Sequence, residues 1–116
     1  MTDDRPKRPV QRRQARYIYV IRLSKGVLRE RRFVRANPNR DPGKKCVYVG
    51  LTGRLPEERF QQHKDGIKSA RYVKKYGKNL LPSLGRKTYK SHKKALKIER
   101  ELAERLREKG FGVWQK

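Results

Sequence analysis

The sequence predicts a small α+β domain, and three stretches of the chain carry this prediction. Residues 17–23 and 46–50 are short, apolar and rich in tyrosine and β-branched residues, which is typical of strands buried on both faces. Residues 91–110 carry apolar side chains at the spacing of an amphipathic helix. Because the chain has 116 residues, of which 34% are hydrophobic, it fits one domain with a small core.

The segments before the second strand are rich in basic residues. Residues 1–16 contain two prolines and six lysines or arginines, and they predict a flexible basic arm. Such an arm could follow a phosphate backbone or serve only as a solubilising tail. The domain then spans residues 17–116. Within it, residues 27–34 predict an extra extended segment with exposed basic positions, and residues 37–43 have the composition of a loop.

A helix is predicted after the second strand. Pro56 suits the first helical position, and Glu57 and Glu58 suit the positive end of the helix dipole. Phe60 and Ile67 are expected on its buried side.

The remaining elements are bounded by capping residues. Residues 69–76 predict a second helical segment that ends at Gly77, and residues 79–89 predict a loop or a short strand. Ser91 is a plausible N-cap of the last helix, and Gly110 a plausible residue just after its end. Residues 111–114 are then expected to fold back and extend the core.

The net charge of the chain points to a polyanionic partner. The 34 lysines and arginines exceed the 11 acids by 23 charges, and nucleic acid is the partner that best relieves this repulsion. A membrane surface fits less well, because no long basic helix carries a broad apolar face. No apolar run is long enough for a signal peptide or a membrane span. The single cysteine, Cys46, excludes an internal disulfide and fits a reducing compartment, so we expect a cytoplasmic protein.

One acid lies where an apolar residue is expected. When residues are placed at about 100° each along the last helix, Glu99 falls within the apolar stripe, whereas Glu101 and Glu104 point to the opposite side. A carboxylate on a core-facing stripe is costly unless it is neutralised, paired or bound to a metal. Glu99 is therefore a candidate catalytic or metal-binding residue.

Two further groups of residues could carry chemistry. Arg59 and His63 are four residues apart on the predicted helix, so both side chains lie on one face. Arginine can hold a phosphate with a planar set of donors, and histidine can move a proton near neutral pH. Tyr17, Tyr19 and Tyr48 lie in the predicted strands, where they either pack the core or place a hydroxyl at the rim of a site.

These residues together resemble the GIY-YIG nuclease domain. The resemblance covers residues 17–114 and rests on the following segments: Tyr17-Ile18-Tyr19 in place of GIY, Tyr48-Val49-Gly50 in place of YIG, Leu51-Thr52-Gly53-Arg54, the R-x-x-x-H spacing of Arg59 and His63, and Ala95-Leu96-Lys97-Ile98-Glu99. The resemblance implies a central, mainly antiparallel three-stranded sheet flanked by helices. It also implies an endonuclease that hydrolyses phosphodiester bonds, with DNA as the favoured substrate and RNA as a possible one.

The sequence departs from the family pattern in three places. Tyr17 stands where the triplet has glycine. The spacing between Tyr19 and Tyr48 is longer than a short hairpin, which indicates an insertion at about 24–45. An asparagine that often follows the glutamate helix has no clear match near Phe111 and Gly112.

The resemblance also implies a role for each site residue. Glu99 would bind a single Mg²⁺ or Mn²⁺ ion. Tyr19 would act as general base, with its pKa lowered from about 10 by Arg59, His63 and the metal. His63 could instead accept the proton through Tyr19. Arg59 would neutralise charge on the phosphoryl oxygens, and Tyr48 would orient the phosphate or the water.

Two other functions remain consistent with the sequence. A protein this basic could bind RNA or a ribosome without catalysis, its nuclease site being degenerate. Residues 71–90 could dock onto a larger repair or recombination complex. Tyr72 and Tyr76 could stack on bases, but their spacing favours packing within a helix. The sequence assigns no oligomeric state. The candidate contacts to nucleic acid are Tyr17, Arg54, Arg71, Lys74 and Lys75.

Overall fold

The computed structural model describes residues 14–115. Most of the predicted basic arm, residues 1–13, lies outside the described residues. Its last residue, Arg16, already begins the first strand, β1 (Arg16–Leu23).

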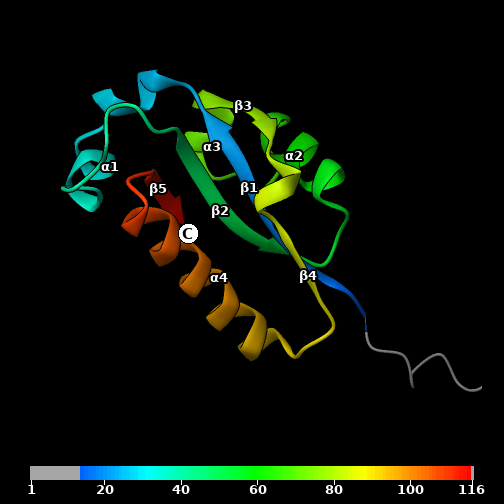
Figure 1. Ribbon diagram of the computed structural model, residues 1–116. Helices are drawn as coiled ribbons and strands as arrows, with labels where there is room; N and C mark the ends of the chain where they lie inside the picture. Colours follow the sequence, from blue (N-terminus) through cyan, green and yellow to red (C-terminus); the bar gives the residue numbers. More distant parts are fainter. Residues whose placement is uncertain (1–13, 116) are drawn as a thin grey trace, which may run out of the picture.

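The described residues form a five-stranded mixed sheet built around β1 (Figure 1). The second predicted strand, β2 (Cys46–Thr52), pairs antiparallel with β1 from Tyr17↔Thr52 to Leu23↔Cys46. The other edge of β1 pairs with two short antiparallel strands, one along each half. These are β3 (Gly77–Leu80) and β4 (Arg86–Thr88), joined by the short 3₁₀ helix η3 (Pro82–Leu84).

The predicted three-stranded, mainly antiparallel sheet was wrong in strand number and in the direction of its last pair. The residues expected to fold back after the last helix form β5 (Gly112–Gln115), which pairs parallel with β2. A long helix lies between the preceding strands and β5. It returns the chain to the starting end of β2, and a parallel pair requires a crossover of this kind.

The insertion at about 24–45 forms helices instead of the predicted extended segment. It contains the 3₁₀ helix η2 (Lys25–Arg29) and α1 (Arg31–Ala36). Val27 and Phe33 are fully buried, and the Phe33 ring lies 6.4 Å from that of Trp114. The arginines between them are exposed, and a period-two alternation does not describe this pattern.

The predicted helices are confirmed, with one residue misplaced. The helix α2 (Pro56–Lys64) begins at the predicted proline, and α3 (Arg71–Tyr76) ends before Gly77. Phe60 packs against the core, but Ile67 follows the end of α2 and is 53% exposed. The expectation that Ile67 lies on the buried side was therefore wrong, because the helix ends before that residue.

The last helix, α4 (His92–Glu108), has the predicted caps. The Ser91 hydroxyl accepts a hydrogen bond from the Lys94 N–H at 3.3 Å, and Gly110 has a φ of +94° just beyond the helix. Among the helices of residues 14–115, none is long and apolar enough to span a membrane.

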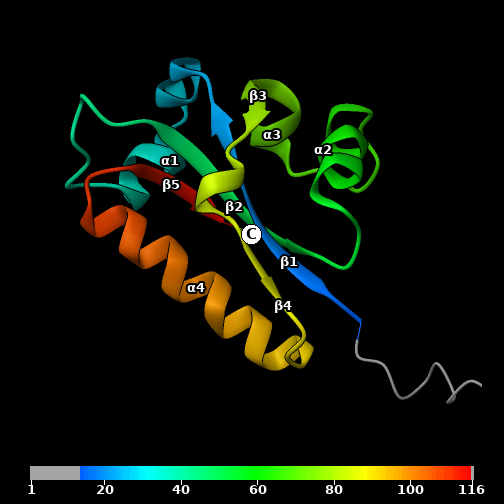
Figure 2. The same ribbon diagram turned by 45° about the vertical axis from the view of Figure 1, so that its right-hand side comes forward.

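The sheet separates two hydrophobic clusters (Figures 1 and 2). The helix α4 lies on one face of the sheet, and α2 and α3 lie on the other. Alternate residues of β1 and β2 point to opposite faces, so the two strands supply both clusters. On the α4 face the buried residues are Ile18, Val20, Val47, Val49, Leu102, Ala103, Leu106 and Val113. On the other face they include Tyr19, Ile21, Leu23, Val27, Phe33, Cys46, Tyr48, Tyr72, Val73 and Tyr76.

Candidate active site

A cavity of about 300 Å³ brings together four of the five predicted catalytic residues. They come from four elements: Tyr19 from β1, Tyr48 from β2, Arg59 from α2 and Glu99 from α4. The remaining lining residues are Leu51, His92 and Leu96. The fifth predicted residue, His63, is 1% exposed and does not line the cavity, but its ring lies 6.0 Å from that of Tyr19 and 5.6 Å from that of Tyr48.

Gly50 leaves the space that the two tyrosines occupy. It pairs with Tyr19 across β1 and β2, and it follows Tyr48 by two residues, so all three face the same side of the sheet. A methyl group at position 50 would lie 2.6 Å from the Tyr19 hydroxyl oxygen and 2.8 Å from Tyr48 Cε2. These distances are shorter than non-bonded contacts allow. The glycine of the YVG segment is thus required by packing at the site.

His63 is fixed as a hydrogen-bond donor to Tyr19. Its Nδ1 accepts the backbone N–H of Ala70 at 2.9 Å, so in the neutral ring the hydrogen is carried by Nε2. Nε2 lies 2.8 Å from the Tyr19 hydroxyl oxygen. His63 therefore donates to Tyr19 in this arrangement. Proton transfer from Tyr19 to His63, the alternative expected from the sequence, would first require the bond from Ala70 to break.

The protein's own groups raise the pKa values of both tyrosines. Burial is the main cause of the raised pKa of Tyr19, and Tyr48 raises it further, while Arg59 opposes the shift. Burial and then Glu99 raise the pKa of Tyr48. The sequence led us to expect a lowered pKa for Tyr19. The opposite direction follows because loss of water disfavours the phenolate more than Arg59 favours it.

Arg59 is held at the edge of the cavity by the loop that follows α2. Its guanidinium donates to the carbonyl oxygens of Ile67 and Lys68 at 3.1 and 2.7 Å, and to the side chain of Gln62 at 3.3 Å. These bonds fix the orientation of a group that carries five donors. The loop that holds Arg59 is continuous with Ala70, which orients His63.

Glu99 is buried, as the helical pattern predicted. Its side chain is among the buried residues of α4 and is 6% exposed. It is the acid that lines the cavity, and residues 14–115 contain no group of three or more histidines, cysteines or acids placed to hold a metal. This donor set, one carboxylate beside tyrosine hydroxyls and open volume, fits a hard divalent ion that keeps most of its waters.

The predicted nucleic-acid contacts do not form one group with the cavity. Arg54 is exposed after β2, and Arg71, Lys74 and Lys75 are exposed on α3. Lys75 forms an ion pair with Glu30, with 3.6 Å between Nζ and Oε2. Tyr72 and Tyr76 are each 5% exposed, which confirms that they pack within the core. Tyr17 is half-buried and lines a different cavity from that of Glu99.

Sequence reasoning missed His92 and Leu96. Both line the cavity, seven and three residues before Glu99 on α4. These spacings place all three on one helix face, so the helical period could have identified them once Glu99 was singled out. Both residues are far in sequence from Tyr19 and Tyr48, so the sequence did not indicate that all four line one cavity.

Comparison with protein families agrees with this geometry. The family model described as the GIY-YIG catalytic domain matches residues 16–111. The chain belongs to the GIY-YIG family. The match begins with β1 and ends just before β5, so it includes every residue of the cavity. Searches of curated proteins and of solved structures gave no significant match. GIY-YIG domains are generally nucleases, which places the chain in a nuclease family.

Proposed function

We propose that this GIY-YIG protein is a metal-dependent endonuclease that hydrolyses phosphodiester bonds in nucleic acid, with DNA as the favoured substrate. One observation carries the proposal: a single cavity collects Tyr19, Tyr48, Arg59 and Glu99 from four separate elements. Phosphodiester hydrolysis needs a base for the attacking water and positive charge near the phosphoryl oxygens. The cavity offers residue types suited to both.

The hydrogen bonds suggest how the side chains divide the work. Tyr19 is the general base, and donation from His63 Nε2 to its oxygen stabilises the phenolate once it forms. Tyr48 orients the water or the phosphate through its hydroxyl. Arg59, fixed by the loop after α2, neutralises charge on the phosphoryl oxygens.

A divalent cation, Mg²⁺ or Mn²⁺, is part of the proposal, and Glu99 would hold it. When bound, such an ion supplies positive charge that stabilises the developing phosphate charge and the leaving oxygen. It would also oppose the burial that raises the pKa of Tyr19.

The proposal is tested by replacing Glu99. Supercoiled plasmid is incubated with the protein, with and without Mn²⁺, at two salt concentrations. We expect Glu99→Ala to abolish metal-dependent nicking while plasmid binding survives. Glu101→Ala is the matched control, since Glu101 is exposed on the same helix. Unchanged nicking by Glu99→Ala would refute the assignment.

The phosphate contact has its own test. We expect Arg59→Ala to lower the cleavage rate by about 100-fold or more, the usual cost of removing a donor to a developing charge. Arg100→Ala removes the same charge from an exposed position of α4 and should have little effect on the rate. Equal losses in the two variants would mean that Arg59 is only one more contact to the backbone of the nucleic acid.

The net charge of +23 also favours a second function, binding of nucleic acid without cleavage. In that case the wild-type protein would shift plasmid or structured RNA in a salt-sensitive manner, and no strand breaks would appear with either metal. Breaks that depend on Mn²⁺ and on Glu99 would exclude this function as the sole one.

A further inference from the structure

A second cavity of about 300 Å³ lies next to the candidate active site, and Tyr19 lines both cavities. This cavity, called the edge groove below, is lined on the β1 side by Tyr17 and Tyr19. Pro56 and Glu57 of α2 and Leu80 of β3 also line it. Its volume is at the lower end of the range for ligand pockets, about 300–1,000 Å³.

The sheet topology creates the edge groove. Along the outer edge of β1, β4 pairs with Arg16–Ile18 and β3 pairs with Ile21–Leu23, which leaves a gap opposite Tyr19 and Val20. The chain crosses this gap at η3, where the Leu81 N–H donates to the Val20 carbonyl oxygen at 2.8 Å. The groove is therefore bounded by paired backbone on both sides, and it is a fixed feature of the fold.

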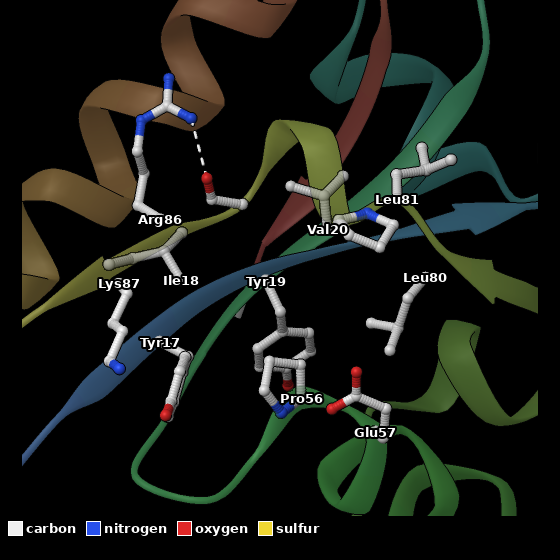
Figure 3. A pocket seen from close by; sticks show the side chains of 12 residues that line it. Tyr17, Ile18, Tyr19, Val20, Pro56, Glu57, Leu80, Leu81, Arg86 and Lys87 are labelled. Atoms are coloured by element: carbon white, nitrogen blue, oxygen red, sulfur yellow. Dashed lines mark hydrogen bonds between the residues drawn. The ribbon is translucent and has the colours of Figure 1, made fainter.

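The walls of the edge groove suit a nucleobase. Tyr17 and Tyr19 are aromatic, Pro56 and Leu80 are apolar, and an aromatic side chain can stack on any base. In Figure 3 the side chains of Tyr17 and Tyr19 project from β1 toward the side on which Pro56 and Glu57 of α2 lie.

Two charged side chains, Lys87 and Glu57, would orient a nucleotide in the groove. Lys87 pairs with Tyr17 across β1 and β4, and its Nζ lies 5.9 Å from the centre of the Tyr17 ring. It can hold a phosphate at the outer end of the groove. Glu57, at the α2 end, repels phosphate and can accept a hydrogen bond from an amino group of a base. Arg86 points away from the groove and donates to the Gly85 carbonyl oxygen at 2.9 Å (Figure 3).

Tyr17 is also the residue that departs from the family triplet, in which glycine precedes isoleucine and tyrosine. With glycine at this position the groove would lose one of its two aromatic walls. The departure and the groove thus coincide at a single side chain.

We propose that the edge groove receives one unpaired nucleobase of the substrate, stacked on Tyr17, while Lys87 holds the adjoining phosphate. This inference rests on the proposed nuclease function and specifies its substrate. A base stacked and paired within a duplex cannot enter the groove, so the substrate must contain a single-stranded or extruded nucleotide next to the scissile phosphate. Because Tyr19 lines both cavities, a nucleotide in the edge groove lies next to the catalytic cavity.

The test measures binding without cleavage, so it is independent of nuclease activity. A single-stranded thymidine oligonucleotide with one central 2-aminopurine is titrated with the Glu99→Ala protein, and stacking quenches the fluorescence. A fully paired duplex of the same sequence is titrated in parallel. We expect quenching and tighter binding with the single strand only.

The variants locate the stacking surface. In the same background, Tyr17→Ala should weaken single-strand binding about 5- to 150-fold and remove most of the quenching, whereas Tyr17→Phe should keep both. Tyr89→Ala is the matched control: Tyr89 is exposed and its ring lies 5.5 Å from Lys87 Nζ, but it does not line the groove. Its effect should be less than twofold.

The cation has a separate readout. Lys87→Ala should lower the slope of log affinity against log salt by about one phosphate contact, and Lys90→Ala, which changes an exposed lysine outside the groove, should affect binding less.

A Tyr17→Ala effect below twofold would overturn the proposal. Equal losses in Tyr17→Ala and Tyr89→Ala would also overturn it, in favour of a diffuse aromatic surface. If the wild-type protein cleaves nothing while binding still depends on Tyr17, the nuclease function fails and the edge groove stands. If the wild-type protein cleaves nucleic acid but binding does not depend on Tyr17, the edge-groove proposal fails and the nuclease function stands.

Discussion

The two faces of the sheet differ in chemistry although the same two strands build both. The face covered by α4 is aliphatic, with Ile18 and Val20 of β1 packing against Leu102 and Leu106. The face covered by α2 and α3 is aromatic and carries polar groups, and its Tyr19 is hydrogen-bonded with His63. Residues adjacent in sequence therefore contribute to different properties: Ile18 and Val20 contribute to stability, and Tyr19 between them contributes to the candidate site.

The two faces also differ in what burial requires of a side chain. An aliphatic side chain gains about 1.5–3 kcal/mol from burial and needs no partner. A buried hydroxyl needs a hydrogen bond, and the Tyr76 hydroxyl donates one to Glu30 at 2.6 Å. Glu99 is the exception on the aliphatic side, since α4 carries this carboxylate to the cavity that the tyrosines line. Four substitutions can test the division between the two faces.

The largest effect is expected on the aliphatic face. Leu106→Ala should lower the free energy of unfolding by about 2–5 kcal/mol, because Leu106 is 2% exposed and the cavity left behind cannot fully collapse. Urea unfolding measures this loss. Cleavage per folded molecule should be unchanged. Leu55→Ala, at a leucine that is 51% exposed, is the control and should cost about 0.5 kcal/mol or less.

Gly50→Ala should lower both the stability of the fold and the rate of cleavage. The added methyl group forces the Tyr19 and Tyr48 rings apart, so we expect about 1–3 kcal/mol of destabilisation and a loss of cleavage of at least about 100-fold. Unfolding curves and nicking rates measure the two effects. Gly53→Ala is the control, since a methyl group there meets no atom within 4 Å. Wild-type activity in Gly50→Ala would disprove the packing argument.

His63 should act on the rate through Tyr19. His63→Ala removes the hydrogen bonds with Tyr19 and Ala70, and it should cost about 1–3 kcal/mol of stability and about tenfold or more in cleavage rate. His63→Gln offers an amide N–H and should recover part of the rate. The pH profile is the deciding measurement, because loss of a donor to the phenolate should move the rising limb of the rate to higher pH. An unmoved limb would assign His63 a purely structural role.

The smallest effect concerns alkaline stability. Burial raises the pKa of Tyr19 in the folded protein, so the folded state retains a proton that the unfolded chain releases above about pH 10. The associated stability is present below pH 10 and is lost as the pH rises further. Between pH 9 and 11 the wild type should lose about 1 kcal/mol more than Tyr19→Phe, measured by urea unfolding at each pH. The exposed Tyr89→Phe should behave as the wild type does.

Several elements of the site could be predicted because their signals are local. The spacing of Arg59 and His63 placed both on α2, and the helical period turned Glu99 inward on α4. The same reasoning failed for residues 27–34, where a short basic segment forms helices because Val27 and Phe33 bury against distant residues. The residues next to Val27 and Phe33 in the sequence do not indicate these distant packing partners, one of which is Trp114.

Four features follow from the sequence alone: the strands β1 and β2, the capped helix α4, the inward carboxylate of Glu99 and the membership in a nuclease family. Each depends on side chains a few residues apart, whose periodicity follows from backbone geometry. Three other features are visible only in the folded domain: β5 runs parallel to β2, Ala70 makes His63 a donor, and Tyr17 lines a second groove. These features depend on contacts between segments far apart in the chain, and burial and pairing across such distances are set by the packing of the whole domain.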